Sequence, residues 1–159
     1  MAKKRKIIFL LLVSLSFYAF SWAEQLKIAP DFKLPAARGG SVNLGSFKGK
    51  QAVLLFFWAT WCPYCRDELS LLNEKYPELQ KDGIALLAIN IGESAERINR
   101  FMKNYNLNFP VLLDANNNVA YDYAVLGIPE YVLIDKEGYV VYYENRFIHR
   151  EQYQRLLKK

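Results

Sequence analysis

The chain has 159 residues, of which 52% are hydrophobic, and a formal net charge of +5. Four basic residues stand together at Lys3, Lys4, Arg5 and Lys6, so the remainder is close to neutral and gives no support for binding to nucleic acid or to a polyanionic substrate. The length is sufficient for one domain with a well-formed core and too short for two.

The first 23 residues have the pattern of an export signal. The basic cluster precedes an apolar stretch from Ile7 to Phe20, and small residues stand at Ser21 and Ala23. This arrangement is typical of a signal peptide that is cleaved after Ala23. An uncleaved membrane anchor is the alternative, because residues 7–23 reach the lower limit of a membrane span. In both cases we expect residues 24–159 to form a single domain in the periplasm or another extracytoplasmic space, since the basic flank stays cytoplasmic.

Strand patterns come next along the chain. The turn Arg38-Gly39-Gly40 separates the short runs Asp31–Leu34 and Ser41–Asn43, which predicts an N-terminal β-hairpin. Continuous apolar runs at Ala52–Phe57 and Ile84–Ile91 predict strands that are buried on both faces.

Helical patterns fill the gaps between these strands. A first helix is predicted from Cys62 to about Lys75, with Pro77 ending or kinking it and a short further turn reaching Lys81. Ser94 is expected to cap a second helix. Strands alternating with helices and followed by a terminal hairpin predict an α/β sandwich with a central mixed sheet. The remaining predicted elements are a strand at Val111–Leu113, a helical turn at Val119–Ala124, a hairpin of Tyr131–Asp135 with Tyr139–Tyr143, and a helix at His149–Lys158.

The only two cysteines, Cys62 and Cys65, stand just after the first buried run. Residues three apart share one face of a helix, so the two sulfurs can meet across its first turn as a readily exchanged disulfide. Cys62 is predicted to be the nucleophile, with an exposed sulfur, because amide N–H groups at a helix N-terminus favour a thiolate. Pro63 suits the first helical position. Cys65 begins an apolar stripe, so we expect it to be buried and to act as the resolving cysteine.

A pair of cysteines at this spacing can also supply two of the four ligands of a zinc site, or form a disulfide whose role is purely structural. Zinc normally takes four ligands, and the chain has no further cysteine and a single histidine, His149. A structural bridge stabilises most when it closes a long loop, and this one closes a very short loop. Thiol redox exchange, without a metal or cofactor, is therefore favoured. An exported dithiol tends to become oxidised, so a reductant of this kind requires an electron-donating partner.

Five motifs follow one another in a specific order: Ala29-Pro30-Asp31-Phe32, the segment from Phe57 to Glu68, Asn90-Ile91-Gly92-Glu93-Ser94, Gly127-Ile128-Pro129, and Leu133-Ile134-Asp135. In this order they resemble the thioredoxin superfamily, and within it the exported TlpA/ResA/CcmG-like thiol-disulfide oxidoreductases. The resemblance spans about Ala29 to Glu144 and implies a thioredoxin-like sandwich.

The resemblance also implies a client-binding surface. In the family the loop proline, here Pro129, is cis and lies against the disulfide, where its backbone pairs with an extended client; an ordinary trans proline is the alternative. Ile128 precedes it in the same loop. Trp61, Pro63 and Tyr64 complete this surface, and Trp61 is expected to shield the disulfide.

Three positions bear on proton transfer. The buried aspartate that cytosolic thioredoxins carry six residues before the first cysteine is replaced here by Phe56. Glu68 stands where ResA-like proteins carry an active-site glutamate, so it is expected to take or return the proton of Cys65; a solvated helix glutamate is the alternative. Glu130 follows the loop proline, as in CcmG-like members, and is expected to line the client groove unless it is a surface charge.

The resemblance favours a disulfide reductase of the cytochrome c maturation type. It implies a disulfide-bearing client such as an apocytochrome c, a membrane thiol donor of the DsbD/CcdA type, a monomeric state and a possible membrane tether through residues 7–23. A disulfide oxidase or isomerase is the main alternative. A peroxidase would carry a threonine where Ala59 stands, and a metallochaperone would have a wider cysteine spacing and a histidine.

Overall fold

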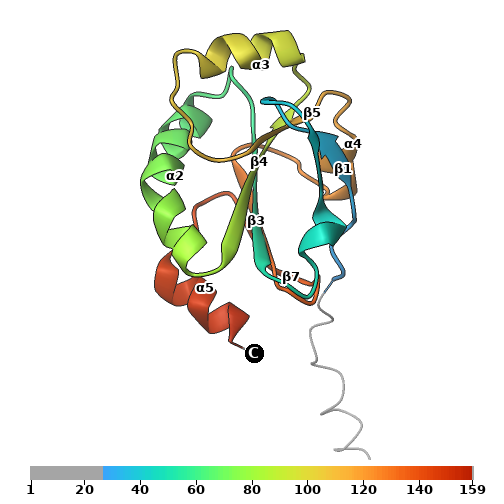
Figure 1. The fold of residues 1–159 in the computed structure, drawn as a ribbon, viewed down its shortest axis with the longest axis vertical. Coiled ribbons are helices and arrows are strands. Elements are labelled where there is room, and N and C mark those ends of the chain that lie inside the picture. The colour runs from blue at the N-terminus through green and yellow to red at the C-terminus, as the bar shows by residue number, and fades with distance from the viewer. Residues whose placement is uncertain (1–26, 159) are drawn as a thin grey trace, which may run out of the picture.

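A computed structural model describes residues 27–158, and the predicted signal peptide or anchor at residues 1–23 lies outside this range. Five strands form a mixed sheet in the order β5-β4-β3-β6-β7, and β1 and β2 form a separate hairpin (Figure 1). No helix within the described range is long and apolar enough to cross a membrane. The elements are β1 (Lys33–Pro35), β2 (Ser41–Asn43), the 3-10 helix η2 (Leu44–Phe47), β3 (Ala52–Trp58), α2 (Pro63–Lys81), β4 (Ile84–Ile91), α3 (Ala95–Met102), β5 (Val111–Asp114), α4 (Asn118–Asp122), β6 (Glu130–Ile134), β7 (Val140–Glu144) and α5 (Arg150–Leu157).

Strand β3 lies at the centre of the sheet, parallel to β4 and antiparallel to β6. All seven of its residues are buried, which confirms the strand predicted from the apolar run. Successive side chains point to opposite faces, so β3 contributes to two separate cores. Leu54, Phe56 and Trp58 belong to the core on one face, and Leu55 and Phe57 to the core on the other.

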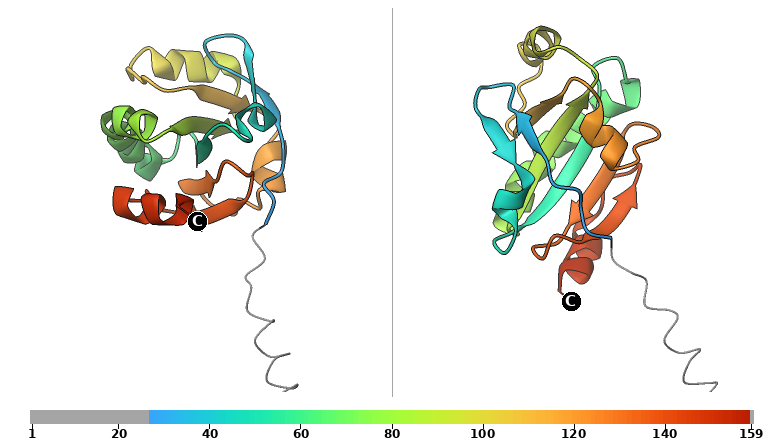
Figure 2. Two further views of the ribbon diagram at one scale, coloured as in Figure 1. Left: turned by 60° about the horizontal axis from the view of Figure 1, so that its bottom comes forward. Right: turned by 90° about the vertical axis from the view of Figure 1, so that its right-hand side faces the viewer.

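Helices α2, α3 and α5 cover the first of these faces, and α4 covers the second together with the β1–β2 hairpin (Figure 2). Gly39 and Gly40 have φ of 97° and 78°, as the hairpin turn requires. Ala37 donates its backbone N–H to the carbonyl of Val111 at 2.9 Å, so the hairpin also covers the edge strand β5. The predicted α/β sandwich with a central mixed sheet and an N-terminal hairpin is confirmed.

Helix α2 continues through Pro77 to Lys81, so Pro77 does not end the first helix, and the further turn predicted up to Lys81 belongs to the same helix. Proline has no N–H to donate to the carbonyl four residues earlier, here that of Asn73. The loop before β5 supplies a replacement donor, since Asn108 Nδ2 lies 3.4 Å from that carbonyl oxygen. The Asn108 backbone also donates to Asn73 Oδ1 at 3.0 Å. This loop therefore stabilises the helix at the position where proline removes a hydrogen bond.

The chain enters the domain at one end of the sheet, and the cysteines lie at the other end. Near the start of β3, the chain enters the domain, where Ile28 bridges Tyr139 and the carbonyl of Lys27 accepts the N–H of Val140 at 2.9 Å. At the opposite end, β3 leads directly into the loop that carries Cys62 (Figure 1). The cysteines thus lie at the end of the domain remote from the entering chain.

Candidate active site

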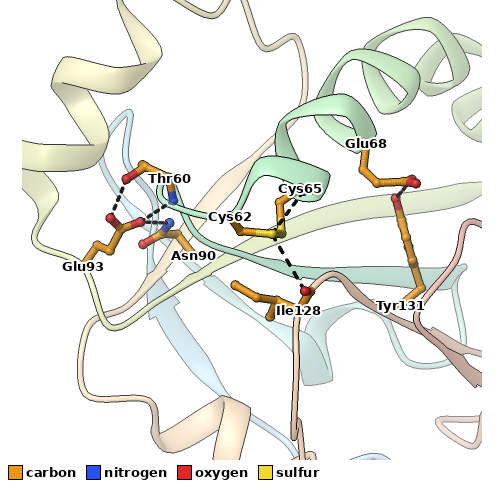
Figure 3. Close-up of a disulfide and its surroundings, with 8 residues drawn as sticks. All are labelled: Thr60, Cys62, Cys65, Glu68, Asn90, Glu93, Ile128 and Tyr131. Atoms are coloured by element: carbon orange, nitrogen blue, oxygen red, sulfur yellow. Dashed lines mark hydrogen bonds between the residues drawn. A yellow bond between two sulfur atoms is a disulfide. The ribbon is translucent and has the colours of Figure 1, made fainter.

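Cys62 and Cys65 form a disulfide with a Cα–Cα distance of 5.3 Å. Cys62 is the N-cap of α2, and its Sγ accepts a hydrogen bond of 3.1 Å from the backbone N–H of Cys65 (Figure 3). Pro63 occupies the first turn, where its missing N–H costs no hydrogen bond. The predicted position of Cys62 at a helix N-terminus is confirmed, and this position favours a thiolate in the reduced protein.

The exposures of the site residues differ in part from the predictions. Cys65 is buried as predicted, but Cys62 is only 3% exposed, so the expectation of an exposed sulfur is wrong for the oxidised protein. The carbonyl oxygen of Ile128 lies 3.8 Å from Cys62 Sγ and covers it from the sheet side (Figure 3). Trp61, expected to shield the disulfide, is 61% exposed, and Tyr64 is 76% exposed. Both aromatic rings are therefore available for contact with a client.

The loop before β6 lies next to Cys62 and contains the family's loop proline. The Ile128–Pro129 peptide bond is cis, which confirms the family expectation. Leu126 is fully exposed in the same loop. The loop therefore combines a backbone close to Cys62 with an open apolar side chain. Leu126 was not singled out from the sequence, because an exposed leucine in a loop follows no periodic pattern.

Glu68 is held by a tyrosine rather than being freely solvated. Its Oε2 accepts a hydrogen bond of 2.5 Å from the hydroxyl of Tyr131 (Figure 3). Glu68 is half-buried and Tyr131 is fully buried. Burial, together with the hydrogen bond to Glu68, raises the pKa of Tyr131, so the phenol remains a donor at neutral pH. This partner was missed, because nothing in the sequence relates β6 to the second turn of α2.

Glu130 is not the surface charge considered as an alternative. It is 9% exposed, and its Oε1 is buried with no hydrogen-bond partner within the described range. It pairs with Phe57 across the β3–β6 ladder, on the face opposite to α2. Burial, with a contribution from the charge of Glu144, raises the pKa of Glu130. Glu130 thus lies beside the cis-proline, at the first position of β6.

A second buried carboxylate, Glu93, fixes the loop that leads to Cys62. It accepts hydrogen bonds from the N–H of Thr60 at 2.7 Å, from the Thr60 hydroxyl at 2.6 Å and from Asn90 Nδ2 at 2.8 Å (Figure 3). It also pairs with Arg97 Nε at 2.7 Å. This role was missed from the sequence, although two signals were available: a glutamate two residues after a buried strand, and a threonine two residues before the cysteine.

In the stretch from Lys27 to Lys158, no group of three or more His, Cys, Asp or Glu side chains is arranged to hold a metal ion. The reactive groups that the described residues bring together are the two thiols at the start of α2 and the carboxylate of Glu68 on the same helix. Two thiols that close across one helical turn can exchange two electrons with another disulfide through a mixed disulfide.

Comparison with known proteins agrees with this chemistry. Residues 26–143 match the model of the AhpC/TSA family. The chain belongs to this family. It is 36% identical over 143 residues to the thiol-disulfide oxidoreductase ResA of Bacillus cereus, with 88% of this chain and 82% of the relative covered. It is 40% identical over 113 residues to ResA of Bacillus subtilis, with 71% and 63% covered.

Solved structures show the same fold. A Chlorobium tepidum protein assigned as the thiol:disulfide interchange protein DsbE matches with a TM-score of 0.73 and 27% identity, over 85% of this chain and 96% of that one. The exposed lipoprotein thioredoxin of Streptococcus pneumoniae matches with a TM-score of 0.71 and 29% identity, over 81% and 98%. The fold is thus thioredoxin-like, and the protein is a ResA/DsbE-like thiol-disulfide oxidoreductase that acts on disulfide-bearing clients.

Proposed function

We propose that the protein is an exported reductase of client disulfides, of the cytochrome c maturation type, with apocytochrome c thiols as the client class. The observation that carries the direction of electron flow is the environment of Cys62. Neither Pro63 nor Tyr64 carries a positive charge, and among residues 27–158 the hydrogen bond that Cys62 Sγ accepts comes from the backbone N–H of Cys65. The helix N-terminus is then the source of thiolate stabilisation that these residues provide, and we infer that the reduced form is stabilised less than in a strongly oxidising dithiol, so that the protein donates electrons.

The reaction proceeds in two exchanges. Cys62 thiolate attacks one sulfur of the client disulfide, the other client sulfur leaves as a thiolate, and a mixed disulfide forms. Cys65 then gives its proton to Glu68 and attacks Cys62 Sγ, and the second client sulfur leaves as a thiolate. The client gains two electrons and the enzyme becomes the disulfide seen in the structure. A membrane thiol donor of the DsbD/CcdA type returns the two electrons.

The client-binding surface consists of Trp61, Tyr64, Ile128 and Pro129, together with Pro63 at the helix start. The two exposed aromatic rings and the Ile128 carbonyl 3.8 Å from Cys62 Sγ support this assignment. Glu130 directly follows Pro129 at the start of β6, and we assign its side chain to the lining of the client-binding groove. We further propose that the protein acts as a monomer outside the cytoplasm and that residues 1–23 direct its export.

Measurement of the reduction potential tests the direction. The purified domain, equilibrated in glutathione buffers, is expected to show a value near that of thioredoxin, about −270 mV. A value near that of DsbA, about −120 mV, would refute the assignment as a reductase and favour the alternative, a disulfide oxidase or isomerase. N-terminal sequencing of the exported protein distinguishes cleavage after Ala23 from a retained anchor.

The peroxidase alternative is disfavoured by the residues before Cys62. Ala59 offers no hydroxyl, and the nearby hydroxyl of Thr60 already donates to Glu93 at 2.6 Å. We therefore expect no peroxide consumption by the reduced protein beyond the rate of a free thiol.

A further inference from the structure

Tyr131 is fixed in place by the core beneath the active-site helix. It is the second residue of β6, and its ring is fully buried on the sheet face covered by α2. The ring centroid lies 4.8 Å from that of Phe56 and 5.9 Å from that of Phe147. Rings packed on two sides leave the hydroxyl little freedom, so its position is determined by the fold.

That hydroxyl meets Glu68 on the sheet side of α2, one helical turn after Cys65 (Figure 3). No other hydrogen bond or ion pair of the Glu68 carboxylate occurs among residues 27–158. Tyr131 on β6 is the titratable group that contacts this carboxylate, and the cysteine pair lies at the start of the same helix, one turn earlier. Tyr142 of β7 lies next to Tyr131, and Glu130 points to the other face of the sheet.

We propose that Tyr131 is a positioning residue for thiol-disulfide exchange, which holds the Glu68 carboxylate at the height of the first helical turn so that it accepts the proton of Cys65. The proposal rests on the role given to Glu68 under the proposed function. In the resolving step the S–H bond of Cys65 breaks, its proton passes to Glu68, and Cys65 Sγ bonds to Cys62 Sγ. The client–Cys62 bond breaks, and its electron pair leaves on the client sulfur.

The hydroxyl affects this step in two ways. The donated hydrogen bond engages Oε2 of Glu68 and leaves Oε1 of the same carboxylate to accept the proton. It also selects one rotamer of a long side chain that would otherwise extend into solvent from the helix surface. Without the hydroxyl, both the rate of resolution and its dependence on pH are expected to change.

The test uses the reduced protein mixed rapidly with an aromatic disulfide reagent whose released thiolate absorbs visible light. The first release reports attack by Cys62, and the second reports attack by Cys65. Between pH 5 and 9, Tyr131→Phe is expected to slow the second phase about tenfold and to shift its pH profile, with the first phase unchanged. Tyr123→Phe is the matched control, since its hydroxyl bonds to the Pro30 carbonyl at 2.8 Å on the other face of the sheet.

Two further variants keep the outcomes distinct. In the double variant Tyr131→Phe with Glu68→Gln, the second phase is expected to match that of Glu68→Gln alone, because the two residues act through one proton transfer. Glu68→Asp keeps the charge but is too short to reach Tyr131, so it is expected to behave like Tyr131→Phe even if the latter folds poorly. If Glu68→Gln slows the second phase but Tyr131→Phe and Glu68→Asp keep the wild-type rate and pH profile, the positioning role of Tyr131 is refuted and the proposed role of Glu68 stands. If Glu68→Gln has no effect either, the proposed role of Glu68 fails as well.

Discussion

Replacement of Glu93 by alanine is expected to destabilise the fold strongly, whereas replacement of Glu96 is not. Both residues form an i,i+4 ion pair with an arginine at 2.7 Å, Glu93 with Arg97 and Glu96 with Arg100. They differ in burial: Glu93 is buried and accepts three further hydrogen bonds, whereas Glu96 and Arg100 are exposed. The two glutamates therefore have the same sequence spacing to their arginines and differ in how deeply the carboxylate is buried.

The magnitudes follow from that difference. Removing one partner of a buried pair costs about 3–5 kcal/mol, and the low end applies because Arg97 stays in solvent. Glu93→Ala also leaves the Thr60 N–H and hydroxyl and the Asn90 amide without their acceptor. We expect a loss of about 3 kcal/mol for Glu93→Ala and about 0.3–0.5 kcal/mol for Glu96→Ala.

Urea unfolding of the oxidised proteins, followed by tryptophan fluorescence, measures both values. With a slope of about 1.5 kcal/mol per molar urea for a domain of this size, the midpoint of Glu93→Ala should fall by roughly 2 M. That of Glu96→Ala should fall by less than about 0.4 M. Similar shifts for the two variants would show that the hydrogen bonds to Thr60 and Asn90 contribute little, and would refute the reasoning from burial.

Four more predictions concern individual residues. In the reduced protein, Cys62 should alkylate at least about tenfold faster than Cys65, because it is at the helix N-terminus and Cys65 is fully buried; equal rates in a mass-spectrometric time course would contradict the assigned roles. Glu130→Gln should be more stable than the wild type above about pH 4.5, because burial raises the pKa of Glu130 and folding then opposes its ionisation. The gain in stability should vanish at lower pH. A gain that is independent of pH in urea titrations would count against this explanation. Hydrogen bonds from Arg150 and Tyr153 hold the pKa of Asp82 at about 2, so its contribution to stability should be complete above about pH 4 and disappear as pH falls to about 2; Asp82→Asn should remove that part of the acid sensitivity. Ala124→Gly should stabilise the fold by about 1 kcal/mol, since Ala124 has a φ of 54°, and a lower melting temperature for this variant would disprove strain at that position.

The elements with strong patterns could be predicted from the sequence. Strand β4 has the predicted bounds, and β3 extends the predicted run by one residue, because a buried central strand is apolar throughout. Ser94 caps α3 as predicted, since its side chain accepts the N–H of Arg97. Local patterns of this kind involve residues close in the chain, and therefore appear in the sequence.

The errors and omissions concern contacts between residues far apart in the chain. Pro77 is tolerated in α2 because Asn108 compensates for its missing donor, and Cys62 is buried because the loop of Ile128 lies over it. The partners of Glu68 and Glu93 likewise come from other elements, Tyr131 on β6 and Thr60 after β3. Such pairs depend on the register and twist of the sheet, which no single segment specifies.

The separation of the disulfide from the entering chain affects how a tethered form of the protein would meet its partners. The seven residues of β3 span about 20 Å, and they lie between the end where Lys27 enters and the end that bears Cys62. If residues 7–23 are retained as an anchor, the disulfide faces away from the lipid, toward clients that diffuse in the aqueous space. A donor embedded in the same bilayer then reaches the disulfide only when the domain rotates relative to the membrane. The length of the segment before Lys27 would therefore limit the rate at which the disulfide is re-reduced. It would not affect the attack of Cys62 on clients.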